Sequence, residues 1–111
     1  MNIQIYAAKR DFDVQKAERY FKERRIPYAF VDMGRHPLGA RELKLFVARI
    51  GLQDLIRPSE DWEAHYIRQL TDQDAAVQEL LDKQKLLRTP LVRNGQQVTV
   101  GYCPEAWAEW K

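Results

Sequence analysis

The sequence predicts a single α/β domain built on a four-stranded mixed sheet. Three features carry this prediction: an alternating segment at 2–6, an apolar run at 28–33 that follows a helical pattern, and an Asn-Gly pair between two strand-like segments within 89–100. The chain has 111 residues, which is the size of one domain. A chain of this length can bury an adequate core without disulfides or metals.

The N-terminal third predicts a βαβ unit. Apolar and polar residues alternate over 2–6, as they do in a strand. Residues 12–24 place apolar side chains at helical spacing, and Asp11 and Asp13 are both suited to accept amide hydrogens of the first turn. The nearly continuous apolar run at 28–33 is typical of a strand in a parallel sheet. The crossover between the two strands is therefore expected to be right-handed.

The middle of the chain predicts a helical insertion over about 39–85. Apolar side chains recur at helical spacing in three segments: 39–50, 59–69 and 72–84. Thr71 is the candidate N-cap of the last of these helices, with Asp74 three residues further on. Residues 52–57 are short and irregular, so we predict no regular element there.

The C-terminal part predicts a β-hairpin and a closing helix. The pair Asn94-Gly95 separates the strand-like segments 89–93 and 96–100, and it suits the two positive φ angles of a type I′ turn. Pro104 fits the first position of the last helix, because the N–H that proline lacks is unpaired at that position.

The order of the elements is that of a thioredoxin-like fold. A βαβ unit, a helical insertion and a ββα unit give a mixed sheet with helices on both faces. We assign the whole chain, 1–111, to one such domain. In this fold Pro90, which directly precedes the hairpin, occupies the position of a cis-proline.

Charge argues against direct binding of nucleic acid. The formal net charge is +2, with 12 Lys+Arg against 7 Asp+Glu in residues 1–57, and 6 against 9 in residues 58–111. A nucleic-acid-binding protein needs a concentrated basic stripe. The basic stretch 22–25 is interrupted by Glu23 and is expected to be the solvated end of a helix.

Other classes are excluded by what the sequence lacks. One cysteine permits no internal disulfide and no zinc site built on paired cysteines. His36 and His65 do not form a metal-ligand spacing, so we expect no metal. There is no apolar run of about 18 residues and no signal-peptide pattern at the start. We therefore expect a cytoplasmic protein that does not contact membranes.

Two aromatic pairs lie at helical spacing, Trp62 with Tyr66 and Trp107 with Trp110. Side chains three or four residues apart on a helix are neighbours, so this spacing predicts packing. An exposed pair would instead indicate a site for a partner protein.

The whole chain resembles the ArsC/Spx family of thioredoxin-fold proteins, which includes glutaredoxin-linked arsenate reductases and transcription regulators. The resemblance is carried, in family order, by six segments: Ile3 to Tyr6, Val14 to Phe21, Ala40-Arg41-Glu42-Leu43, Leu55-Ile56-Arg57, Leu86 to Val92, and Val100 to Glu105.

The resemblance implies a degenerate active site. The nucleophilic cysteine of the reductases, at the start of their first helix, corresponds to Asp11, and Arg10 precedes it. A family arginine before the cis-proline corresponds to Thr89, and another in the closing turn corresponds to Tyr102. Arg57 matches an oxyanion-binding arginine.

Asp11 excludes the chemistry of the missing thiol. A carboxylate forms no thiol–arsenic bond and does not enter disulfide exchange, which requires sulfur. Its own negative charge also repels an oxyanion. Arg88 is one residue out of register, so the resemblance does not assign it the role of the lost arginine. We therefore expect no catalytic residues, and Asp11 to act as a helix cap.

Three functions follow, in order of preference. The first is a regulatory or protein-interaction role without reductase activity, with an unidentified protein partner. The resemblance implies RNA polymerase as one candidate for this partner, because some members of the family bind it. The second is a thiol redox protein that acts through Cys103 with glutathione as the only cofactor, because a cysteine at a helix N-terminus can be reactive. The third is a glutaredoxin-dependent arsenate reductase.

Overall fold

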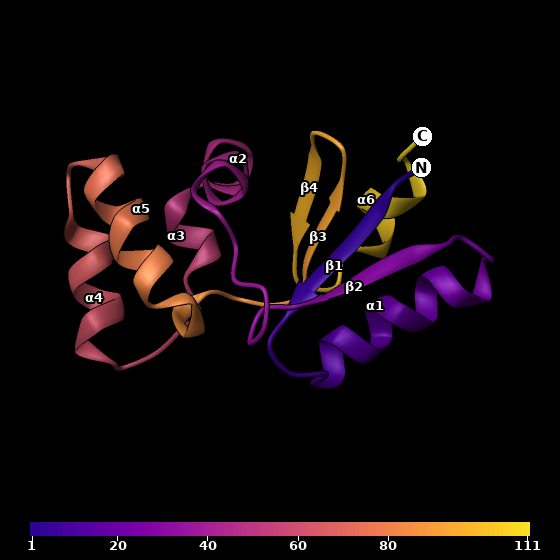
Figure 1. Cartoon of the computed structure of the whole chain (residues 1–111), viewed down its shortest axis with the longest axis horizontal. Coiled ribbons are helices and arrows are strands. Elements are labelled where there is room, and N and C mark those ends of the chain that lie inside the picture. The colour runs from indigo at the N-terminus through magenta and orange to yellow at the C-terminus, as the bar shows by residue number, and fades with distance from the viewer. The chain divides into compact units, whose positions relative to one another are not determined.

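The computed structural model describes all 111 residues and contains one four-stranded sheet and six α-helices (Figure 1). The strands are β1 (Ile3–Ala7), β2 (Tyr28–Asp32), β3 (Leu91–Asn94) and β4 (Gln97–Val100). The helices are α1 (Phe12–Glu23), α2 (Ala40–Ile50), α3 (Leu52–Leu55), α4 (Trp62–Gln69), α5 (Gln73–Asp82) and α6 (Pro104–Ala108), with a 3-10 helix at Gln84–Leu86.

The chain divides into two compact units. Residues 1–36 and 89–111 form the unit that contains the sheet, and residues 37–88 form an all-helical unit. They are called the sheet unit and the helical unit below, and each is described by itself. No helix in either unit has the length and apolar character needed to cross a membrane.

The sheet has the strand order β2-β1-β3-β4. β1 runs parallel to β2 and antiparallel to β3, and β3 pairs antiparallel with β4. Ile5 in the central strand β1 lies opposite Phe30 in β2 and Val92 in β3. This arrangement confirms the predicted mixed sheet, because the helical crossover between β1 and β2 allows parallel pairing and the hairpin gives antiparallel pairing.

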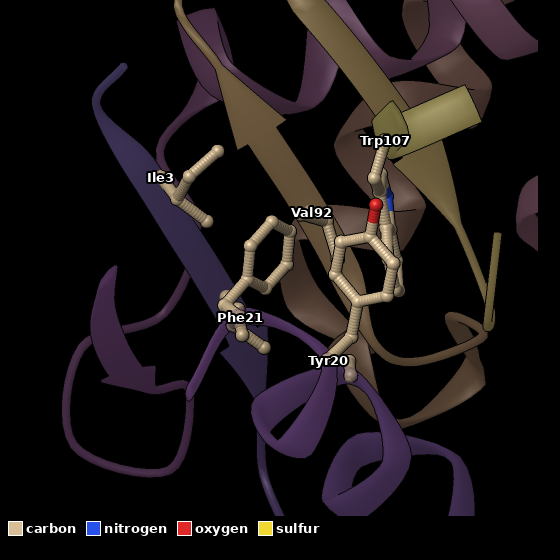
Figure 2. Close-up of a cluster of buried hydrophobic side chains, with 7 residues drawn as sticks. Ile3, Tyr20, Phe21, Val92 and Trp107 are labelled. Carbon is tan, nitrogen blue, oxygen red and sulfur yellow. The ribbon is translucent and has the colours of Figure 1, made fainter. Parts of the chain in front are cut away.

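Helices α1 and α6 share one face of the sheet, where they enclose an aromatic core (Figure 2). The Tyr20 ring lies 5.0 Å from the Phe21 ring and 5.2 Å from the Trp107 ring, measured between centroids. Ile3 and Val92 pack beneath these rings from the sheet. Trp107 is fully buried, as its helical spacing predicts, and this burial anchors the short helix α6.

The hairpin differs from the prediction by one residue. Asn94 pairs with Gln97, so the two-residue loop is Gly95-Gln96, and only Gly95 has a positive φ, of 62°. A single positive φ at a first-position glycine is the pattern of a type II′ turn, so the predicted type I′ turn is wrong. Asn94 is held in the strand by its own side chain, which accepts from Asn2 N (3.1 Å) and donates to Lys111 O (3.2 Å).

The helical unit has its own apolar core, to which α2 and α5 contribute most. Its fully buried side chains include Leu43, Phe46, Leu55, Ile67 and Leu80. α5 packs against both α2 and α4.

Two details of the helical unit differ from the predictions. The N-cap of α5 is Asp72 and not Thr71, because the Asp72 carboxylate accepts hydrogen bonds from Asp74 N (3.0 Å) and Ala75 N (3.4 Å). The segment expected to be irregular contains the one-turn helix α3.

Candidate functional site

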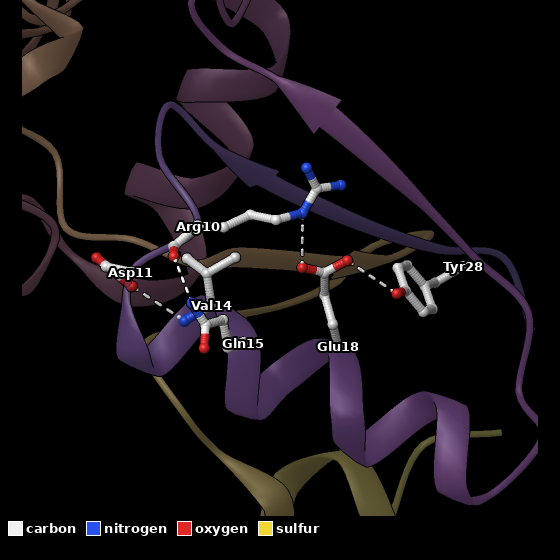
Figure 3. A network of polar contacts seen from close by, with 6 residues as sticks. All are labelled: Arg10, Asp11, Val14, Gln15, Glu18 and Tyr28. Atoms are coloured by element: carbon white, nitrogen blue, oxygen red, sulfur yellow. Dashed lines mark hydrogen bonds and ion pairs between the residues drawn. The ribbon is translucent and has the colours of Figure 1, made fainter.

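Asp11 caps α1. Its Oδ1 accepts a hydrogen bond from Val14 N at 3.0 Å (Figure 3). Its backbone oxygen accepts from Gln15 N at 2.9 Å. The first amides of a helix have no partner within the helix and carry its positive dipole end. The carboxylate of Asp11 therefore occupies the place where a helix N-terminus would otherwise stabilise a thiolate or a bound anion.

The guanidinium of Arg10 points away from Asp11 and toward the middle of α1 (Figure 3). Its Nε donates to Glu18 Oε1 at 2.9 Å, and its Cζ lies 3.9 Å from the centroid of the Phe30 ring. The second carboxylate oxygen of Glu18 accepts from the Tyr28 hydroxyl at 2.9 Å. Arg10 is thus fixed by an ion pair and by a ring, and its charge is directed to Glu18.

Burial and the Glu18 carboxylate raise the pKa of Tyr28 from 10.0 to about 12. Burial has the largest effect, followed by the hydrogen bond to Glu18 and by its negative charge, while Arg10 opposes the shift. An open hollow of about 600 Å³ lies over this network, and its lining includes Lys22 and Arg25. Tyr28 is therefore a neutral hydrogen-bond donor at physiological pH.

Glu18 and Tyr28 were not singled out from the sequence. The available signal was weak: Glu18 stands on the side of α1 that Val14, Ala17 and Phe21 bury, and a carboxylate in that position needs a partner. Tyr28 lies ten residues further on, in a different element, so helical spacing alone does not connect the two.

The sheet unit also contains Thr89, Pro90 and Tyr102. The peptide bond between Thr89 and Pro90 is cis. Tyr102, which follows the positive-φ glycine of the closing turn, is 42% exposed and lies edge-on to Trp107, with 5.6 Å between ring centroids. The Lys16 ammonium stands 5.4 Å from the Tyr102 ring centroid. The closing turn therefore places an aromatic ring where the resemblance has an arginine.

Cys103 is half-buried at the N-cap of α6 and packs against the aromatic core. Its Sγ donates a hydrogen bond to Val100 O at 3.2 Å. A thiolate has no hydrogen to donate, so this contact is made by the neutral thiol alone.

Arg57 and Arg88 belong to the helical unit, where two short segments pair through Ile56 and Leu87. The Arg57 guanidinium lies 3.5 Å from Leu87 O, a weak contact. Arg88 Nη1 donates to Asp54 O at 3.1 Å, so this side chain is held against the backbone of α3.

The polar side chains at the start of α1 make bonds within the sheet unit. Asp11 caps the helix and Arg10 forms an ion pair with Glu18. No group of three or more His, Cys, Asp or Glu side chains in the chain is arranged to hold a metal ion.

The four-stranded mixed sheet, with α1 and α6 on one face and a helical segment between β2 and β3, defines a thioredoxin-like α/β protein. The ArsC family model matches residues 8–110. The chain therefore belongs to the ArsC family, and its fold is that of the arsenate-reductase-like members.

Solved structures share this fold at low sequence identity. A protein from Yersinia pestis has a TM-score of 0.80 and 22% identity, and the match covers 97% of this chain and 99% of that one. An arsenate reductase from Vibrio cholerae has a TM-score of 0.80 and 18% identity, with 98% and 97% covered. An arsenate reductase (ArsC) related protein from Brucella melitensis has a TM-score of 0.66 and 20% identity, with 99% and 94% covered. No curated protein sequence matches the chain.

Proposed function

We propose that this protein is a member of the ArsC family without reductase activity, and that it acts by binding a protein partner. RNA polymerase is the partner that the sequence resemblance suggests. The observation that carries the first part is the hydrogen bond between Asp11 Oδ1 and Val14 N, at 3.0 Å.

The capping bond supports the loss of activity for two reasons. The carboxylate has no sulfur with which to attack arsenate or form a disulfide. It also brings a negative charge to the helix N-terminus, where an incoming oxyanion would otherwise gain from the dipole. Substrate binding and nucleophilic attack are therefore both opposed at one position.

The test is arsenate turnover with glutathione and glutaredoxin, measured on the purified protein and on Asp11→Cys. We expect the folded, unaltered protein to show no turnover at any protein concentration. Asp11→Asn is the matched control, because it removes the charge of the cap, keeps an oxygen acceptor and supplies no nucleophile. Activity in Asp11→Cys alone would mean that the scaffold retains a reductase-like site which Asp11 silences.

Turnover by the unaltered protein would contradict the proposal. If both proteins are inactive, the missing arginines at Thr89 and Tyr102 also contribute, and the absence of activity stands. Circular dichroism of each variant establishes that an inactive sample is folded.

The alternative, a thiol redox protein that uses Cys103 and glutathione, is tested on the same samples by mass spectrometry after incubation with oxidised glutathione. The hydrogen bond from Sγ to Val100 O and the partial burial of the side chain support a slow thiol. Rapid formation of a glutathione adduct on Cys103 at neutral pH would favour the redox function instead.

A further inference from the structure

Helix α4 exposes two large aromatic side chains. Trp62 is 72% exposed and Tyr66 is 49% exposed, and their ring centroids lie 6.4 Å apart. The packing predicted from their spacing is limited to this mutual contact, and neither ring enters the core. Aromatic side chains with this exposure are enriched where proteins bind one another.

Two carboxylates flank the rings. A hollow of about 300 Å³ is lined by the aromatic pair and by Glu63 and Ile67 of α4 and Glu79 and Lys83 at the end of α5. Lys83 Nζ lies 2.6 Å from Glu79 Oε2 and 3.8 Å from Glu63 Oε2. The hydrogen bond to Glu79 raises the pKa of Lys83 above its ordinary value of 10.5, so Lys83 is a cation at neutral pH. The hollow thus already holds one ammonium group against two carboxylates.

The surrounding surface is strongly acidic. Segment 59–82, which contains α4 and α5, has seven Asp and Glu residues and one basic residue, Arg68. The guanidinium of Arg68 donates to Ile56 O at 2.8 Å, so it is directed to the backbone. A surface with this charge attracts cationic partners and repels nucleic acids.

We propose that this acidic–aromatic face, formed by Trp62, Glu63, Tyr66 and Glu79, binds a basic segment of a partner protein. An arginine or lysine side chain of the partner would lie against the exposed ring of Trp62, where a cation is attracted to the π face, with the carboxylates beside it. Lys83 is the internal cation that such a side chain displaces. The inference rests on the proposed function and adds the surface and the chemistry of the partner.

The test uses a defined probe, a nine-residue peptide of alternating arginine and alanine with blocked ends. The control peptide has citrulline in place of each arginine, which keeps the shape and removes the charge. Binding is followed by ¹⁵N NMR of the intact protein at 150 mM salt, because each of the three tryptophan indoles contributes one N–H signal. We expect the arginine peptide to shift the Trp62 signal in a saturable way, and the citrulline peptide to leave it unchanged. The Trp107 signal should not move, because its Nε1 is buried and donates to Thr99 Oγ1 at 2.8 Å.

Variants of Trp62 and Lys83 test the roles of the ring and of the charge, because they should change the peptide affinity in opposite directions. Trp62→Ala should weaken peptide binding at least about tenfold, as loss of a central interface aromatic does. Trp62→Phe should restore part of the affinity. Lys83→Gln should strengthen binding about two- to fivefold, because it removes the competing cation. Lys22→Gln is the matched charge control for Lys83→Gln, since Lys22 is an exposed helical lysine of the sheet unit. It should leave the affinity unchanged.

Several results would overturn this proposal. They are equal binding of both peptides, shifts confined to the sheet unit, or weaker binding by Lys83→Gln. Self-association of the unliganded protein that Trp62→Ala abolishes would also overturn it, because the occupant of the face would then be a second copy. If the peptide does not bind and arsenate turnover stays absent, this inference fails while the proposed function stands. Turnover by the unaltered protein defeats the proposed function whatever the peptide does.

Discussion

Asp11 stabilises the start of α1 through a single side-chain hydrogen bond. We expect Asp11→Ala to lower the free energy of unfolding by about 1 kcal/mol, because the N–H of Val14 loses its acceptor. Asp11→Asn should lose less, since the amide oxygen can still accept. Urea unfolding followed by circular dichroism measures the stability of both variants. Asp13→Ala is the control, because Asp13 lies in the first turn of α1 but is not its N-cap. Equal stability of Asp11→Ala and the unaltered protein would contradict the capping role.

The raised pKa of Tyr28 leads us to expect a loss of folding stability at alkaline pH. Its pKa is raised to about 12 in the folded protein, against 10.0 for an ordinary tyrosine, so the folded state keeps a proton that the unfolded chain releases. The contribution of Tyr28 to stability is therefore complete below about pH 10 and is lost as the pH rises toward 12. Glu18→Gln should bring the pKa of Tyr28 down, because it removes the negative charge next to the hydroxyl.

Alkaline titration of tyrosinate absorbance checks this prediction. The folded protein should show a late-titrating tyrosine that is absent in Tyr28→Phe. The stability of Tyr28→Phe should also depend less on pH between 10 and 12 than that of the unaltered protein. The idea fails if Tyr28→Phe leaves the late titration in place.

For single residues, the sequence supplied candidates for the helix cap and the site, but it did not show where their side chains point. Asp11 was one of two cap candidates, and the choice between them depends on where the first helical turn begins. The ion pair of Arg10 with Glu18 joins the loop before α1 to a residue inside that helix, eight positions along the chain. No local pattern encodes that geometry, so Arg10 was assigned from the resemblance alone.

Among the elements, α6 depends most on a single residue. It is only five residues long, too short to be stable by itself, so its position follows from the burial of Trp107 against Tyr20 and Phe21. We expect Trp107→Ala to cost about 3–5 kcal/mol, as for other large core truncations. Thr99→Val should cost about 1–3 kcal/mol, because the buried indole N–H then has no acceptor.

Chemical unfolding of the two variants measures these losses. Trp110→Ala is the control on the same end of the chain, since Trp110 is only half-buried at the margin of the core and should cost clearly less. A Trp107→Ala protein as stable as Trp110→Ala would show that α6 is held by something other than this ring.

The errors in predicting turns and buried faces have a common cause. They arise where an element is shaped by contacts with residues far away in the sequence. The turn after β3 is shifted because Asn94 bonds to Asn2 and to Lys111, residues at opposite ends of the chain. Trp62 and Tyr66 have the spacing of a packed pair, but α4 buries Ala64 and Ile67 instead. Periodicity gives the type of an element, while the face that it buries depends on its neighbours.

For the whole molecule, the order of the elements was sufficient to predict the sheet. A βαβ unit allows only a parallel pair with a crossover, and a hairpin allows only an antiparallel pair, so four strands in this order have few arrangements. The sequence predicts the helical insertion over about 39–85, and the helical unit covers residues 37–88. Its compactness as a separate unit was not predicted, because the whole chain was assigned to one domain.

Charge, at this largest scale, predicts no direct binding to nucleic acid. The net charge is only +2, and the basic stretch at the end of α1 is interrupted by Glu23, while segment 59–82 is strongly acidic. Nonspecific DNA binding depends on the release of counterions by many phosphate contacts, and this surface offers few of them together. We expect fluorescence anisotropy to detect no binding of a labelled DNA duplex at 150 mM salt, with dissociation constants weaker than about 10⁻⁴ M. Micromolar binding that weakens steeply with added salt would contradict this, and Arg24→Gln together with Arg25→Gln would then show whether the end of α1 is responsible.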